Sequence, residues 1–202
     1  IDLSKLNVDM LALSGHKLHA PKGIGVLYIR RGVRFKPLIT GGHQERGRRG
    51  GTENVPAIIA LGKACEIARK GMDQEVAALS ALRDQLESGI VQAIPRVHVN
   101  GDKASRLPNT SSVSFECIEG EAILSMLNCY GICASSGSAC TTGSLEPSHV
   151  LRAMGVPYTS AHGTIRFSLS KFNTQQEVEK VLEVLPDIIR TLRSISPFWE
   201  EK

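Results

Sequence analysis

Residues 8–29 read VDMLALSGHKLHAPKGIGVLYI, two apolar runs separated by a short polar turn. The runs at 8–14 and 24–29 have the length of strands, and the second is bounded by glycine and arginine as a buried strand would be. A strand so close to the first residue needs neighbours that residues 1–7 cannot supply. We therefore expect two strands, with Ser14, His16 and Lys17 placed where the first one ends.

A basic, glycine-rich segment follows at 31–52, and loops of that length in compact chains are usually functional. Apolar residues at three- and four-residue spacing then predict a helix from 54 to about 70 and a second from about 73 to 94. Gly71 is the expected stop between them. The boundary near Gly71 predicts two domains, residues 1–70 and a smaller one at 71–202.

The second half mixes strands and helices. Period-two alternation predicts half-buried strands at 97–99 and 112–115, and apolar runs predict strands at 132–135 and 165–169. Short helices are expected at 121–130 and 147–154. Thr174 and Glu177 have capping-box spacing for a last helix, which Pro186 should kink or restart. The order indicates an α/β part followed by an α+β part.

The chain has 202 residues, of which 42% are hydrophobic and 22% charged, a composition typical of a globular protein. No apolar run approaches the roughly 20 residues of a membrane span, and residues 1–5 do not resemble a signal peptide, so a cytoplasmic protein is expected. The formal charge of +4 is mild. Basic clusters at 30–36 and 46–49 have no accompanying nucleic-acid-binding motif, which favours a solvated face or a phosphorylated small ligand.

The chain has five cysteines at irregular spacing, and reduced thiols are the better interpretation. A zinc site from Cys129, Cys133 and Cys140 is an alternative that the spacing does not favour. Cys65, Cys129 and Cys133 have apolar neighbours and are expected to be buried and inert. Cys140 differs, because it lies in a loop of small residues at 135–144 that would leave a thiolate exposed.

Two further side chains could carry chemistry. Lys17 follows an apolar strand, where desolvation would lower its pKa and make it a nucleophile toward aldehydes, with Ser14 and His16 beside it to receive a phosphate. Residues 14–17 could also form an ordinary turn at the end of a strand. Arg166 alternates with Ile165 on a predicted strand and faces either solvent or a carboxylate that it grips with two hydrogen bonds.

Taken together, the motifs resemble the pyridoxal-phosphate-dependent cysteine desulfurases, and the resemblance runs along the whole chain. It rests on SGHK at 14–17 followed by PKGIGV, GGHQERGRRGGT at 41–52, SGSACTTGSLEP at 136–147 and HGTIRFS at 162–168. The short thiol loop and the ending ISPF at 195–198 are most similar to the NifS branch, which serves nitrogenase cluster assembly.

The resemblance implies a fold-type I transferase, here a partial large domain at 1–70 and an α+β small domain at 71–202. It implies that Lys17 binds pyridoxal 5'-phosphate covalently and later moves the substrate's α-proton, with Ser14 and His16 on the phosphate. Thr52 would reach the phosphate in a partner subunit, which implies a homodimer. Arg166 would clamp the carboxylate of L-cysteine.

Cys140 would take the sulfur as a persulfide, leaving L-alanine, and pass it to an iron-sulfur scaffold protein. The resemblance also allows Cys140 to be a transient iron-sulfur ligand, with no resident metal. No nucleic acid or membrane partner is implied.

The sequence departs from the family pattern upstream of Lys17, where only sixteen residues are present. The family's aspartate for the pyridine nitrogen, its stacking histidine and its phosphate-cup threonine would lie further upstream. We therefore expect this chain to match the C-terminal half of such an enzyme, to bind the cofactor weakly by itself and to show little turnover. A selenocysteine lyase, another class-V enzyme, or a non-catalytic chain that binds a sulfur acceptor remain alternatives.

Overall fold

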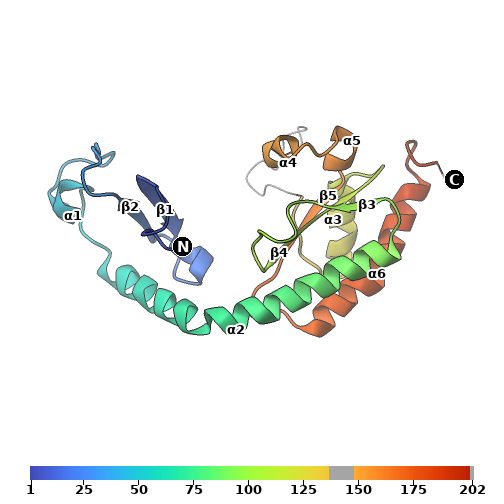
Figure 1. The fold of residues 1–202 in the computed structure, drawn as a ribbon, viewed down its shortest axis with the longest axis horizontal. Helices are drawn as coiled ribbons and strands as arrows, with labels where there is room; N and C mark the ends of the chain where they lie inside the picture. The colour runs from blue at the N-terminus through green and yellow to red at the C-terminus, as the bar shows by residue number, and fades with distance from the viewer. Residues whose placement is uncertain (137–147, 201–202) are drawn as a thin grey trace. The chain divides into compact units, whose positions relative to one another are not determined.

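A computed structural model describes residues 1–136 and 148–200 of the chain (Figure 1). The chain divides into two compact units, Ile1–Met72 and Asp73–Lys202. Helix α2 (Val55–Ala93) contributes residues to both. Within the described residues no helix is long and apolar enough to cross a membrane.

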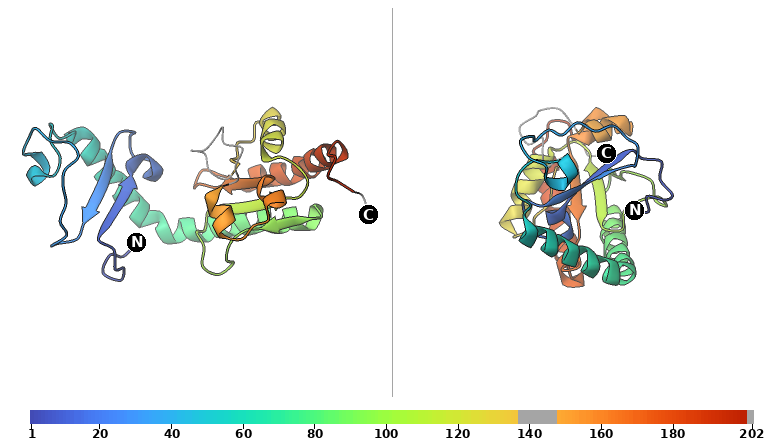
Figure 2. Two further views of the ribbon diagram at one scale, coloured as in Figure 1. Left: turned by 90° about the horizontal axis from the view of Figure 1, so that it is seen from above. Right: turned by 90° about the vertical axis from the view of Figure 1, so that its left-hand side faces the viewer.

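The first unit is built on an antiparallel pair of strands that lie side by side in Figure 2. Strand β1 (Met10–Ser14) pairs with β2 (Gly25–Ile29), so that Ser14 lies opposite Gly25. The 3-10 helix η1 (Gly15–Leu18) follows β1, and a single turn, α1 (Gln44–Gly47), interrupts the long loop. A small core joins the loop after η1 to the start of α2: Ala20, Ile24, Leu61 and Ala64.

Both predicted strands are confirmed in position, but the prediction that the second is buried is wrong. Val26 and Leu27 of β2 are 45% and 48% exposed. The physical reason is that the described unit supplies only two strands and no layer that covers both faces of the pair. An apolar run therefore indicated a strand correctly without indicating what would cover it.

Helix α2 corrects a second expectation, because it runs for 39 residues without the predicted stop at Gly71. A glycine ends a helix when it takes a left-handed conformation, and Gly71 is not among the glycines with positive φ. A glycine inside a helix costs about 1 kcal/mol relative to alanine, and the helix-forming residues on either side outweigh that cost. The two predicted helices are therefore one.

The second unit contains a three-stranded antiparallel sheet in the order β3-β4-β5. These strands are β3 (Val97–Val99), β4 (Thr110–Phe115) and β5 (Thr164–Ser168). One face of the sheet packs its apolar side chains against α2, α3 (Gly120–Cys129) and α6 (Gln175–Ser194). Helices α2 and α6 lie side by side (Figure 1), and Gly89 permits their contact because a Cβ there would lie 2.6 Å from the Leu182 side chain.

The other face of this sheet is polar and also partly covered. Ser112 and Ser114 of β4 lie opposite Arg166 and Thr164 of β5. The Ser114 and Thr164 hydroxyls are 2.7 Å apart and buried, and Thr164 donates to the Ser160 carbonyl in α5 (Tyr158–Ala161). The expectation of a half-buried strand is therefore wrong at Ser114, because α5, which the sequence did not predict, contributes to this cover.

The remaining elements mostly follow the sequence. Helix α6 begins at the predicted capping box, in which Thr174 and Glu177 bond reciprocally, and it continues through Pro186 as one helix rather than restarting. Helix α4 (His149–Ala153) is capped by the Ser148 side chain, and Pro147 lies outside the described residues. The predicted strand at 132–135 is reduced to one bridge between Ser135 and Arg166.

Candidate functional site

The first group of predicted site residues lies where β1 turns into η1. The turn is tight because the buried Gly15 donates to the Ile24 carbonyl at 2.9 Å, and a Cβ on Gly15 would lie 2.8 Å from Ile24 Cγ2. His19 closes η1 in a left-handed conformation with φ 62°. This backbone leaves the side chains of Ser14, His16 and Lys17 exposed at one end of the strand pair.

A hollow in the first unit is lined by Ser14, His16 and Lys22, together with the backbone of 23–25. The Ser14 hydroxyl does not cap η1, so it is available to a ligand. A hydroxyl, an imidazole and an ammonium at one hollow are a donor set that suits a phosphate. The amine of Lys17 projects from the same short helix and suits an aldehyde. The residues present therefore fit pyridoxal phosphate.

The structure corrects the reason given for the reactivity of Lys17. Its side chain is exposed, so the described residues do not supply the burial that was expected there. Lys22 is a residue that the sequence reasoning missed. The signal that could have found it is the Pro21-Lys22-Gly23 turn, which lies just before Gly25, the strand partner of Ser14.

Thr52 lies in the same unit, exposed, just before α2. The loop that carries it is folded back on itself, because Gly50 donates to the Ile39 carbonyl and Gly51 donates to the Gln44 side chain. Thr52 is not among the described residues that line the hollow. The hollow therefore brings Ser14 and His16 together. Lys17 belongs to the same short helix as His16 but, like Thr52, is not among the residues that line the hollow.

Arg166 belongs to the second unit, on the polar face of β5. Its backbone exchanges two hydrogen bonds with Ser135, at 3.1 and 2.6 Å. Next to Ser135, the Ser136 hydroxyl donates to Glu121 at 2.9 Å. Two consecutive residues are thus fixed where the small-residue loop begins. Cys140 itself lies outside the described residues.

The other cysteines differ from expectation. Cys65, Cys129 and Cys133 are exposed, so the prediction that they are buried is wrong. Each is next to apolar residues in the sequence, but its own side chain is not buried with them. Within 1–136 and 148–200, no three His, Cys, Asp or Glu side chains are grouped as a metal site would require.

Comparison with known proteins gives consistent results. The class-V aminotransferase family matches residues 1–181. Cysteine desulfurase 2 of Trichormus variabilis is 65% identical over 202 residues, which are all of this chain and 50% of that protein. The cysteine desulfurase NifS of Azotobacter vinelandii is 60% identical over 199 residues, covering 98% of this chain and 50% of that one.

A solved structure titled NifS-like protein superposes with a TM-score of 0.83 at 42% identity, covering 95% of this chain and 49% of the other. The chain thus spans about half the length of the curated relatives that it matches. The fold is accordingly a partial α/β fold of the fold-type I kind, and pyridoxal phosphate is the cofactor of this class. On the match to residues 1–181, the chain belongs to the class-V aminotransferase family.

Proposed function

We propose that the protein acts in a cysteine desulfurase of the NifS branch, which converts L-cysteine to L-alanine and a persulfide on Cys140 for iron-sulfur cluster assembly in nitrogen fixation. The names of relatives at 65% and 60% identity support this function. The observation that carries it is the hollow lined by Ser14, His16 and Lys22, at the turn where β1 leads into η1, the short helix that includes Lys17.

In this proposal Ser14 and His16 donate hydrogen bonds to the cofactor phosphate and Lys22 adds positive charge. The Lys17 amine attaches the cofactor and afterwards carries the proton removed from the substrate's α-carbon. When bound, pyridoxal phosphate supplies the electron sink that cleavage of a carbon–sulfur bond requires. Because Lys17 is exposed within the described unit, we propose that further residues of the complete site bury it.

Arg166 is proposed to bind the carboxylate of L-cysteine. A guanidinium offers two parallel donors that match a carboxylate, and this pairing is stronger than a neutral hydrogen bond. Arg166 is held for this task by the pairing of β5 with Ser112 on one side and the bridge to Ser135 on the other. It also lies on the polar face of the sheet, away from the apolar core.

Cys140 is proposed to take the sulfur. Its thiolate attacks the substrate sulfur, so the carbon–sulfur bond breaks and a sulfur–sulfur bond forms. The carbon retains the electron pair and accepts a proton, which gives L-alanine. Cys140 is five residues beyond Ser135, and an extended chain of that length spans at most about 18 Å. Because Ser135 is bridged to Arg166, this limit supports the proposal that the Cys140 sulfur reaches a substrate bound by Arg166.

The domain and partner assignments are part of the same proposal. We assign 1–70 to the C-terminal part of the cofactor-binding domain and 71–202 to the small domain that carries Cys140. Thr52 does not line the hollow in its own unit. In the proposal it would contact the cofactor phosphate bound to the second subunit of a homodimer. The persulfide would pass to an iron-sulfur scaffold protein, in the cytoplasm.

An absorbance titration with pyridoxal phosphate tests how well this chain binds the cofactor by itself. We expect the purified 202-residue chain to show weak binding of added pyridoxal phosphate and little turnover, because the proposed partners of the pyridine ring lie outside it. A stable, cofactor-specific absorbance band near neutral pH would contradict that expectation. Lys17→Ala is the control, since any band that survives this change does not come from the proposed site.

A further inference from the structure

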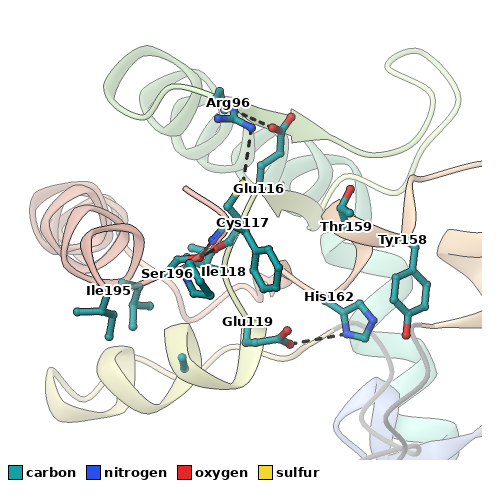
Figure 3. A pocket seen from close by; sticks show the side chains of 14 residues that line it. Arg96, Glu116, Cys117, Ile118, Glu119, Tyr158, Thr159, His162, Ile195 and Ser196 are labelled. Atoms are coloured by element: carbon teal, nitrogen blue, oxygen red, sulfur yellow. Dashed lines mark hydrogen bonds and ion pairs between the residues drawn. The ribbon is translucent and has the colours of Figure 1, made fainter. Parts of the chain in front are cut away.

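The second unit contains a cavity of about 710 Å³ that the proposed desulfurase chemistry does not use (Figure 3). Such a volume is in the range of small-molecule sites. Four segments form it: Arg96 before β3, the residues from the end of β4 to the start of α3, the region of α5, and the end of α6 with the segment that follows it. The cavity lies entirely within the unit that comprises residues 73–202.

The cavity wall is held in place by a buried arginine. Arg193, near the end of α6, donates to the carbonyls of Pro95, Arg96 and Glu116. Burial lowers the pKa of Arg193, and the carbonyls accept the hydrogen bonds that its guanidinium needs. The segment after α6 is fixed in turn, because the Ser196 hydroxyl donates to the Cys117 carbonyl at 2.5 Å. The cavity is therefore built by specific contacts.

Its lining is mainly apolar, with two aromatic side chains. Ile118, Leu192 and Ile195 contribute aliphatic surface. Tyr158 and Phe198 contribute aromatic rings, and these two residues are 60% and 78% exposed. Figure 3 shows Tyr158 beside His162, and the two rings meet edge to face at 4.4 Å between centroids. Exposed aromatic faces attract organic cations through the negative charge of the ring face.

The charges at the cavity also favour a cation. Glu116 forms an ion pair with Arg96 at 2.8 Å, and His98 Nε2 lies 2.8 Å from its other carboxylate oxygen. Glu119 is less compensated, because its ion pair with His162 Nδ1 is 3.7 Å long and its side chain is 72% exposed. Figure 3 shows this pair at one side of the cavity. Figure 3 shows Glu119 and Tyr158 on either side of His162, so the cavity offers an ammonium group a carboxylate and, beyond His162, an aromatic ring.

From these features we propose that this cavity binds small amphipathic organic cations, with the apolar body on Ile118, Leu192 and Ile195 and the ammonium toward Glu119 and Tyr158. The proposal goes beyond the desulfurase function and does not depend on it. Trp199, the single tryptophan of the chain, reports on the site because its ring stacks on Arg96 at 4.8 Å and on Arg193 at 4.1 Å.

The test uses benzyltrimethylammonium, benzyl alcohol and benzoate, which share an aromatic body and differ in charge. A quaternary ammonium cannot condense with pyridoxal phosphate, so the cofactor site does not compete. Binding to the cofactor-free protein is followed by Trp199 fluorescence and by isothermal titration calorimetry. We expect the cation to bind most tightly, the alcohol more weakly and benzoate least.

Variants then assign the binding to the cavity. Glu119→Gln should weaken binding of the cation about five-fold and leave the alcohol unchanged, because it removes the carboxylate alone. Glu121→Gln is the matched control, since it changes the same charge two residues away outside the cavity, and it should have no effect. Ala122→Leu fills the cavity and should weaken all three probes.

Equal affinities for the three probes would overturn the proposal, as would a preference for the cation that survives Glu119→Gln. Failure of the cation to bind at millimolar concentration would overturn it as well. Should Ala122→Leu unfold the protein, Tyr158→Leu replaces it, since this change keeps apolar surface but removes the ring face. It should then reduce the preference for the cation over the alcohol.

Discussion

Ser135 and Arg166 exchange two backbone hydrogen bonds, which fixes Ser135 beside the strand that carries the proposed carboxylate-binding arginine. The arrangement links two residues 31 positions apart in sequence (166 minus 135). Ser135 is also five residues before Cys140 in the sequence. The proposed division of roles, in which Arg166 holds the substrate and Cys140 takes its sulfur, depends on this bridge.

Replacing Arg166 should affect substrate binding more than chemistry. Arg166→Lys keeps the positive charge but loses the two parallel donors, so we expect KM for L-cysteine to rise about ten- to a hundred-fold with a smaller change in kcat. Steady-state kinetics of the native enzyme measure both quantities. An unchanged KM would remove Arg166 from the substrate site.

Replacing Cys140 should separate desulfurase from the alternative activities. Cys140→Ser cannot accept sulfur as a persulfide, so release of L-alanine from L-cysteine should cease. Cys133→Ser is the control, because Cys133 is an exposed cysteine just before the bridge and should be dispensable. A Cys140 variant with full alanine production would instead indicate a lyase or another class-V activity that needs no reactive thiol.

The backbone next to the HGTIRFS motif allows a stability prediction. A Cβ on Gly163 would lie 2.0 Å from the Phe115 carbonyl oxygen and 2.7 Å from that of Ile118. Because both atoms belong to the backbone, Gly163→Ala should lower the free energy of unfolding by about 2 kcal/mol or more. Chemical denaturation measures this change.

Gly62→Ala provides the matched comparison for that substitution. Gly62 is inside helix α2 and no atom lies within 4 Å of a Cβ built there. The added methyl group should therefore stabilise the protein by about 0.5–1 kcal/mol through helix propensity. A Gly163 variant as stable as the Gly62 variant would contradict the close approach at Gly163.

Glu116 predicts a specific dependence of stability on pH. Hydrogen bonds from His98 and then Arg96 hold the pKa of the Glu116 carboxyl below its ordinary value of 4.5. A group whose pKa is lowered on folding stabilises the protein above the unfolded value, and this contribution is lost as the pH falls through the folded value. Glu116→Gln should therefore lower the free energy of unfolding by less than about 1 kcal/mol at neutral pH. It should also reduce the loss of stability as the pH falls.

Denaturation of the Glu116 variant at pH values above and below 4.5 measures this effect. Glu179→Gln serves as the control, because Glu179 lies exposed on α6 and bonds only to Gln175 in the same helix among the described residues. Equal acid sensitivity of the wild-type protein and Glu116→Gln would contradict a depressed pKa at Glu116.

Local sequence signals predicted local structure well. The capping box of Thr174 and Glu177 marked the start of α6 correctly, because both partners lie within one helical turn. The register of β4 and β5 likewise placed Arg166 on the face opposite Ile165, as alternation predicted. Such features depend on residues that are close along the chain.

The incorrect predictions concern what covers a residue, which depends on distant segments. Cys65, Cys129 and Cys133 have apolar sequence neighbours, yet their helix face or loop leaves them exposed. Ser114 looked like a solvent-facing position but is covered on its polar face and bonded to Thr164. The cavity near Glu119 shows the same limit, because its four segments carry no shared motif.

The central claim is that Lys17 binds the cofactor and Cys140 receives the sulfur of one substrate. Peptide mass spectrometry of the native polypeptide tests both parts, after borohydride reduction in one sample and after exposure to L-cysteine in another. We predict the reduced cofactor on the peptide that contains Lys17 and one added sulfur atom on the peptide that contains Cys140. Cofactor mass on another lysine, or added sulfur confined to Cys65, Cys117, Cys129 or Cys133, would contradict the account.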